Sequence, residues 1–161
     1  MDKKEKNFKE LPYRNGVGIV VLNSENKVFV AKRIDNPKNF WQMPQGGVDK
    51  GEDYYEAALR ELKEETSIVS VELIQEIDKK LTYILPDDLI GIIWKGRFKG
   101  QTQKWFIMRF IGSESEININ TKKPEFLDWK WINLEDLTKI AVNFKLDVYK
   151  NLKQEVSKLL N

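Results

Sequence analysis

Residues 46–68 read GGVDKGEDYYEAALRELKEETSI, a glycine-rich loop that runs into a helix rich in carboxylates. On the predicted helix, Glu61, Glu64 and Glu65 stand at i, i+3 and i+4 and share one face, roughly 5–6 Å apart at Cβ. Like charges this close destabilise a helix, and Arg60 cannot screen every pair. A divalent cation would explain the cluster, because Mg²⁺ and Mn²⁺ prefer oxygen ligands. The alternative is a solvated acidic helix face.

The loop before this helix, FWQMPQGGVDKGED at residues 40–53, contains one proline and three glycines and therefore favours turns. A glycine-rich loop that leads into a helix resembles a phosphate cradle, since backbone N–H groups and helix N-termini both attract anions. A plain turn would explain the glycines equally well. The loop contains neither the P-loop ending nor the dinucleotide-binding glycine spacing.

Composition limits the chemistry that this chain can use. Its 161 residues suffice for one sizeable core, and the net charge of +2 predicts no global attraction to nucleic acid. The chain has neither cysteine nor histidine, which excludes disulfides, Ser-His-Asp triads, Cys-His dyads and histidine-ligated zinc. Acid–base work would fall to carboxylates, lysine, tyrosine or metal-bound water. The chain has no apolar run long enough for a membrane span, and its first ten residues lack the apolar stretch of a signal peptide, so we expect a cytoplasmic protein.

The hydrophobic pattern predicts one α/β domain over residues 13–161, with a mixed sheet between helices and a mobile charged tail at residues 1–12. A helix over 53–66 would bury Tyr55, Ala58, Leu59 and Leu62, and an amphipathic helix over 144–160 would close the fold. The first two strands would form a β-hairpin around residues 23–26. The expected strands cover residues 16–22, 27–33, 71–77, 89–94, 104–111 and 126–132.

The stretch at 46–68 resembles the Nudix box, the signature of hydrolases that cleave nucleoside diphosphates linked to another group. Gly46 is followed after five residues by Glu52, and after seven more by Arg60 and the glutamate cluster. The chain departs from the family pattern at Ser67, where the family has a glycine that allows a left-handed backbone at the helix end. The resemblance implies an α/β/α sandwich.

The resemblance also implies roles for the residues of the box. Glu61 and Glu65 would bind the divalent cation, Mg²⁺ or Mn²⁺, with the Gly46 carbonyl as a further ligand. Glu64 would be a third ligand or act through water, and any of the three glutamates could be the base. Glu52 and Arg60, together with Gly46, would be structural, bracing the loop against the helix. Asp53 and Glu56 would be solvent-facing charges.

Segments outside the box resemble one subgroup, the bacterial RNA 5′-pyrophosphohydrolases and the related dinucleoside polyphosphate hydrolases. These segments are WQMPQGG at 41–47, GQTQKWF at 100–106, PEFLDWKWI at 124–132 and VNFKLDVY at 142–149. By this resemblance, Glu125 is an additional metal ligand, although a surface carboxylate is the plain alternative. The residues implied to bind substrate are Arg14, Arg33, Lys145, Phe144, Val142, Gln101, Lys104 and Tyr83.

Three functions remain open from the sequence. The first is removal of pyrophosphate from triphosphorylated RNA 5′ ends, which would promote mRNA decay, and the second is hydrolysis of diadenosine polyphosphates. The third is a silent nucleotide-binding module, which the intact glutamates disfavour. RNA would need a basic path, for which Lys95, Arg97, Lys99, Lys104 and Arg109 are candidates. We expect neither a membrane nor DNA as a partner, and the sequence points to no particular protein partner.

Overall fold

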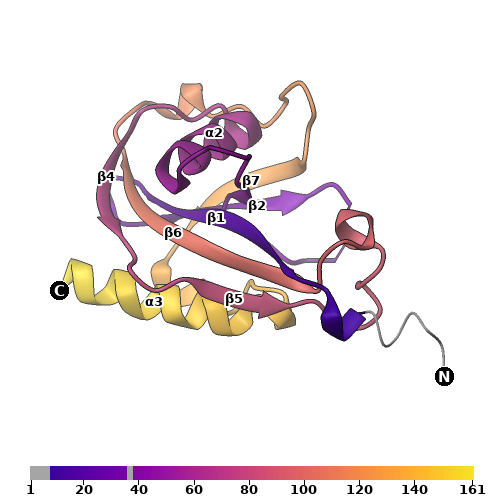
Figure 1. Cartoon of the computed structure of the whole chain (residues 1–161). Helices are drawn as coiled ribbons and strands as arrows, with labels where there is room; N and C mark the ends of the chain where they lie inside the picture. Colours follow the sequence, from indigo (N-terminus) through magenta and orange to yellow (C-terminus); the bar gives the residue numbers. More distant parts are fainter. Residues whose placement is uncertain (1–7, 36–37) are drawn as a thin grey trace.

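The computed structural model describes residues 8–35 and 38–161. Within them a mixed sheet lies between two helices, α2 (Tyr54–Thr66) on one face and α3 (Leu146–Leu160) on the other (Figure 1). This arrangement confirms the predicted α/β/α sandwich. The strands are β1 (Tyr13–Leu22), β2 (Val28–Arg33), β3 (Gln45–Gly47), β4 (Val71–Glu76), β5 (Leu81–Ile84), β6 (Gly100–Phe110) and β7 (Phe126–Ile132).

The sheet is ordered β4-β6-β1-β2-β7, with β3 added to β1 and β5 added to β6. The long central pair, β1 and β6, is parallel from Tyr13↔Gly100 to Leu22↔Arg109, and the other pairs are antiparallel. β3 pairs with β1 through Val17↔Gly46, which fixes the glycine-rich loop to the centre of the sheet. The glycine-rich loop therefore rests on the strand pair that forms the middle of the fold.

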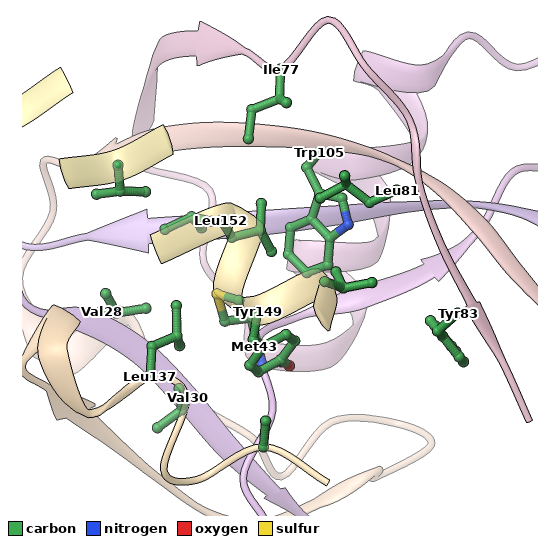
Figure 2. Packing of buried hydrophobic residues seen from close by; sticks show 14 of the residues in the cluster. Val28, Val30, Met43, Ile77, Leu81, Tyr83, Trp105, Leu137, Tyr149 and Leu152 are labelled. Atoms are coloured by element: carbon green, nitrogen blue, oxygen red, sulfur yellow. The ribbon is translucent and has the colours of Figure 1, made fainter. Parts of the chain in front are cut away.

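Each face of the sheet has its own hydrophobic core, because side chains alternate along each strand. Val17, Ile19 and Phe106 pack with Ala58 and Leu62 of α2. On the opposite face, Trp105, Met43, Tyr149 and Leu152 form the core beneath α3 (Figure 2). The Met43 N–H donates a hydrogen bond of 2.8 Å to the buried Tyr149 hydroxyl, which ties α3 to the segment that leads into β3.

Most of the predicted elements are confirmed, including the hairpin, whose strands pair through Leu22↔Val28. The strand predicted at 89–94 is wrong. Residues 86–92 form turns in which the Pro86 carbonyl accepts the N–H groups of Leu89 and Ile90, and a 3₁₀ turn, η1 (Ile93–Gly96), follows. The three-residue β3 and four-residue β5 are too short to show a hydrophobic period.

Two further expectations are corrected by the packing. Tyr55 is 36% exposed, and Ala57 takes its place among the buried residues of α2. Residues 1–7 of the predicted mobile tail lie outside the described residues. Phe8 and Leu11 from the rest of that tail pack against the α3-side core, with Phe8 over Gly91.

The helices in the described ranges include none that is both long enough and apolar enough to cross a membrane.

Candidate active site

Two caps fix the ends of the carboxylate-bearing helix α2. The Asp53 side chain accepts a hydrogen bond of 2.8 Å from the Glu56 N–H, so Asp53 is the N-cap and not merely a solvent-facing charge. At the other end Ser67 has φ 66°, the left-handed conformation that the family glycine would adopt. The Ser67 hydroxyl donates to the Asn118 carbonyl at 2.8 Å, which offsets part of the strain.

Arg60 joins the loop to the helix. Its guanidinium donates twice to Glu52, at 2.8 and 2.9 Å, and once to the Gly47 carbonyl at 2.9 Å. The hydrogen bonds from Arg60 lower the pKa of the Glu52 carboxyl to about 2. The pKa of Arg60 is raised by the same pair. Bidentate contact of this kind fixes geometry as well as charge, so loop and helix are held in one register.

The metal-binding candidates are not equivalent. Glu65 is 2% exposed, and neither of its carboxylate oxygens has a hydrogen-bond partner among the described residues. Burial, followed by the charges of Glu125 and Glu61, raises its pKa well above the usual range. Burial also raises the pKa of Glu61, although the hydrogen bond of 2.8 Å from Arg60 opposes the shift. A buried carboxylate without a donor is costly unless a cation compensates it, so these residues fit a divalent metal ion.

Gly46 and Glu64 complete the neighbourhood of this pair. A Cβ at Gly46 would collide with the Glu61 carboxyl, so only glycine lets β3 approach the helix this closely. Glu64 lies farther out, 59% exposed, and accepts a hydrogen bond of 3.2 Å from Arg60. Across residues 8–35 and 38–161, no three acidic side chains already enclose a metal position. Glu61 and Glu65, with Glu125 and the Gly46 carbonyl, are the groups that could hold the ion.

Cationic side chains lie beside the carboxylates. Arg33 binds Asp35 through two hydrogen bonds of 2.8 and 2.9 Å. This pairing raises the pKa of Arg33, with smaller contributions from the nearby Glu125 and Glu65. The Ile34 N–H donates to the Glu125 carbonyl at 2.9 Å, so the end of β2 brings Glu125 towards the site. Asp35 was not predicted, because a carboxylate two residues after an arginine carries no pattern of its own.

Lys145 is almost fully buried at the start of α3. Its ammonium lies 3.3 Å from the Gln45 side-chain oxygen and 5.3 Å from the centre of the Tyr83 ring. Burial, and then the charge of Arg33, lowers the pKa of Lys145 to about 7. The ring of the neighbouring Phe144 lies 5.7 Å from that of Tyr83, and Val142 precedes it at the cap of the same turn. A lysine that titrates near neutrality can respond to an arriving phosphate.

A buried glutamine network supports this side of the site. The Gln103 amide donates to Gln45 at 3.0 Å and to Gln101 at 3.3 Å, and the Trp105 indole N–H donates to Gln103 at 3.2 Å. The Tyr83 hydroxyl donates to Gln101 at 3.3 Å. The Gln101 side-chain nitrogen has no partner in the described part of the chain. Gln45 and Gln103 were missed, although polar residues on an otherwise apolar strand face are a usable signal.

Lys104 does not join this group. Neighbouring strand residues face opposite ways, so Lys104 points to the α2 face, away from Gln101 and Gln103. Its ammonium lies 3.2 Å from Glu76 and donates to the Asp78 carbonyl at 3.0 Å. Arg109 sits at the far end of β6, where it donates to the Asn23 carbonyl and the Asn26 side chain. The predicted basic path is therefore not continuous.

The NUDIX domain family model matches residues 12–152. A Pelagibacter ubique protein described as an RNA pyrophosphohydrolase is 68% identical over 151 residues, which cover 94% of this chain and 96% of the relative. A Roseobacter denitrificans protein with the same description is 52% identical over 141 residues, with 86% and 88% covered.

Solved structures share the fold at lower identity. The Escherichia coli dihydroneopterin triphosphate pyrophosphohydrolase superposes with a TM-score of 0.70 at 22% identity, covering 89% of this chain and 99% of the other. A Caenorhabditis elegans Ap4A hydrolase in a binary complex gives a TM-score of 0.63 at 21% identity, with 89% and 98% covered. At these identities the likeness concerns the fold alone.

Proposed function

The chain belongs to the Nudix family of hydrolases, which act on phosphoanhydride bonds with a divalent cation, and from this premise we propose that it is an RNA 5′-pyrophosphohydrolase. Water would break the link between the α- and β-phosphates of a triphosphorylated 5′ end. The products are pyrophosphate and RNA with a 5′-monophosphate, the end that promotes decay of the transcript. We also propose a cytoplasmic location and Mg²⁺ as the cation, with Mn²⁺ as a substitute.

One observation supports this proposal: a carboxylate that suits a metal ion and cations that suit phosphates lie at one place. The buried, unpartnered carboxylate of Glu65 lies within the electrostatic reach of both Arg33 and Lys145. The glutamates would hold a metal ion, whose chemistry there would be to activate water and to neutralise phosphoryl oxygens. The cations beside it suit the remaining phosphate oxygens. Relatives that match over most of their length are described as RNA pyrophosphohydrolases, which favours RNA as the source of those phosphates.

The residues then divide by role. Glu61 and Glu65, with Glu125 and the Gly46 carbonyl, would hold the cation, and one of Glu61, Glu64 and Glu65 would accept a proton from water. Arg14, Arg33 and Lys145 bind the phosphates, and Phe144 and Val142 flank the first base, where stacking contributes roughly 1–3 kcal/mol. Tyr83 and Gln101 orient Lys145 through the glutamine network. Lys104 does not contact the substrate in this proposal, because it binds Glu76 on the other face of the sheet.

The proposal is tested with a triphosphorylated RNA oligonucleotide and Mg²⁺. The wild-type protein is expected to release pyrophosphate and leave a 5′-monophosphate. Glu61→Gln should lower kcat by at least about 100-fold, because it weakens a metal ligand. Glu56→Gln is the matched control, since Glu56 is an exposed carboxylate of the same helix. Intact RNA after incubation with wild-type protein, or normal turnover by Glu61→Gln, would overturn the assignment.

A further inference from the structure

The turn at residues 93–96 is strained. Trp94 has φ 55° and ψ 36°, and Lys95 has φ 57° and ψ 28°, so two consecutive residues that are not glycine adopt the left-handed conformation. For a bulky residue this conformation is a genuine outlier. Strain of this kind persists only where the surroundings enforce it, and it clusters at functional sites.

The strained backbone directs the Trp94 indole onto Arg14 at the start of β1. The Arg14 guanidinium carbon lies 5.2 Å from the centre of the indole ring, a cation–π distance. The Phe98 ring meets the indole edge-on, with ring centres 6.1 Å apart and planes at 78°. Trp94 is therefore fixed from one side by Phe98 and presents its ring to Arg14.

Arg14 reaches from this ring to the glycine-rich loop. A Cβ at Gly47 would lie 2.5 Å from an Nη atom of Arg14, so the guanidinium rests against the loop backbone. Arg14 also acts on the pKa of Tyr83, which places its charge near the Lys145 side of the site. Within the described ranges, the guanidinium makes no hydrogen bond or ion pair with another side chain. Its N–H donors are held in place and remain available.

We infer that Trp94 is a positioning residue for Arg14, holding the guanidinium ready for the phosphates of the substrate. This inference rests on the proposed function, because it assigns Arg14 to phosphate binding. An arginine carries much rotamer freedom, and ordering it before binding lowers the loss of entropy on binding. An indole face orders a planar guanidinium without consuming any of its hydrogen-bond donors. An acidic partner would order it too, but would compete with phosphate.

The inference predicts a change in KM with little change in kcat. Trp94→Leu keeps an apolar side chain but removes the aromatic face, and should raise KM for triphosphorylated RNA by about 2- to 30-fold while kcat stays within about twofold. Trp94→Phe keeps a smaller aromatic face and should restore KM to within about threefold of wild type. Ile92→Ala, in the same loop and highly exposed, is the control and should leave both constants unchanged.

A double-mutant cycle with Arg14→Lys separates positioning from packing or base stacking. Lysine keeps the charge but not the planar stack, so Trp94→Leu should add less than about twofold to KM in the Arg14→Lys background. An equal rise in KM in both backgrounds would overturn the inference. A parallel fall in kcat and thermal stability would also overturn it, because Trp94 would then be a packing residue.

If Trp94→Leu does not fold, the same cycle is run with Trp94→Phe, where a rise in KM that persists with Arg14→Lys counts against the inference. The proposed function has a separate readout. Should wild-type protein leave triphosphorylated RNA intact, the function fails, and the cycle is then measured with a diadenosine polyphosphate. Coupling between Trp94 and Arg14 on that substrate would uphold the positioning role alone.

Discussion

At the scale of single residues, Glu65 combines two opposed properties, deep burial and a carboxylate that no group in the described part of the chain donates to. Replacing its carboxylate by an amide removes a buried ionisable group while nearly preserving volume. Glu65→Gln should therefore stabilise the metal-free protein and lower kcat by at least about 100-fold. Thermal melts with EDTA and with Mg²⁺ check this, since Mg²⁺ should raise the Tm of wild type but not that of the variant. A variant that loses stability in EDTA would contradict the account.

The pH dependence of that stability follows from the raised pKa of Glu65. At pH values above 4.5, the ordinary pKa of a glutamate, Glu65 still holds its proton in the folded state, whereas in the unfolded state it has released it. The contribution to the free energy of unfolding is therefore fully present below 4.5 and is lost as pH rises towards the folded pKa. Urea titrations in EDTA from pH 4 upward should show this decline in wild type and a smaller one in Glu65→Gln.

Lys145 should control substrate binding near neutral pH. Its pKa of about 7 means that it is mostly charged at pH 6 and mostly neutral at pH 8.5 in the free protein. Losing one charge-assisted hydrogen bond should raise KM for triphosphorylated RNA about tenfold across this range. Lys145→Arg stays charged and should show a flatter KM profile. Parallel profiles for the two proteins would exclude Lys145 as the titrating group.

At the scale of elements, Arg60 couples the glycine-rich loop to α2. Arg60→Lys keeps the charge but cannot reproduce the bidentate contact, so kcat/KM should fall about 10- to 100-fold and Mg²⁺ should bind more weakly. Lys63→Gln is the control, an exposed cation on the same helix. Metal titration followed by turnover checks both. Equal activity in the two variants would show that the brace has no part in catalysis.

Relieving the strain in the turn at residues 93–96 should raise the stability of the fold. Glycine adopts the left-handed conformation of Lys95 without steric cost, so Lys95→Gly should stabilise the fold by about 0.5–1 kcal/mol. Lys95→Ala removes the same side chain but retains the steric penalty, and should show no such gain. Urea denaturation compares the two. Equal stabilities would mean that the turn carries no strain at this position.

The sequence predicted those elements whose hydrophobic period is long. The helix at 53–66 is one example, because it buries one face, and the strand that became β6 is another, because its apolar residues fill the cores on both faces of the sheet. Leu89–Trp94 is apolar and β-branched, yet it forms turns, since Pro86 and Gly91 interrupt any ladder. The left-handed conformation of Trp94 was not predicted, because its contact with Arg14 joins segments that are distant in the sequence.

At the scale of the whole molecule, the site is assembled from segments distant in the chain, which the sandwich brings to one end of the sheet. The glutamates of α2 were predicted because their spacing lies within one helix. Glu125, Arg33 and Lys145 were assigned only by family resemblance, since no local pattern links them. The burial of Lys145 and the Gln45–Gln103 contact depend on how α3 meets β3, and that is a property of the tertiary fold.

The preference for RNA or a dinucleotide depends on the whole molecule, because both substrates would use the same metal-binding and phosphate-binding residues. In the most direct test, a triphosphorylated RNA and diadenosine tetra- or pentaphosphate compete for the protein in the presence of Mg²⁺. The kcat/KM values of the two substrates are then compared. We expect a higher kcat/KM for the RNA. A clear preference for the dinucleotide would contradict this expectation.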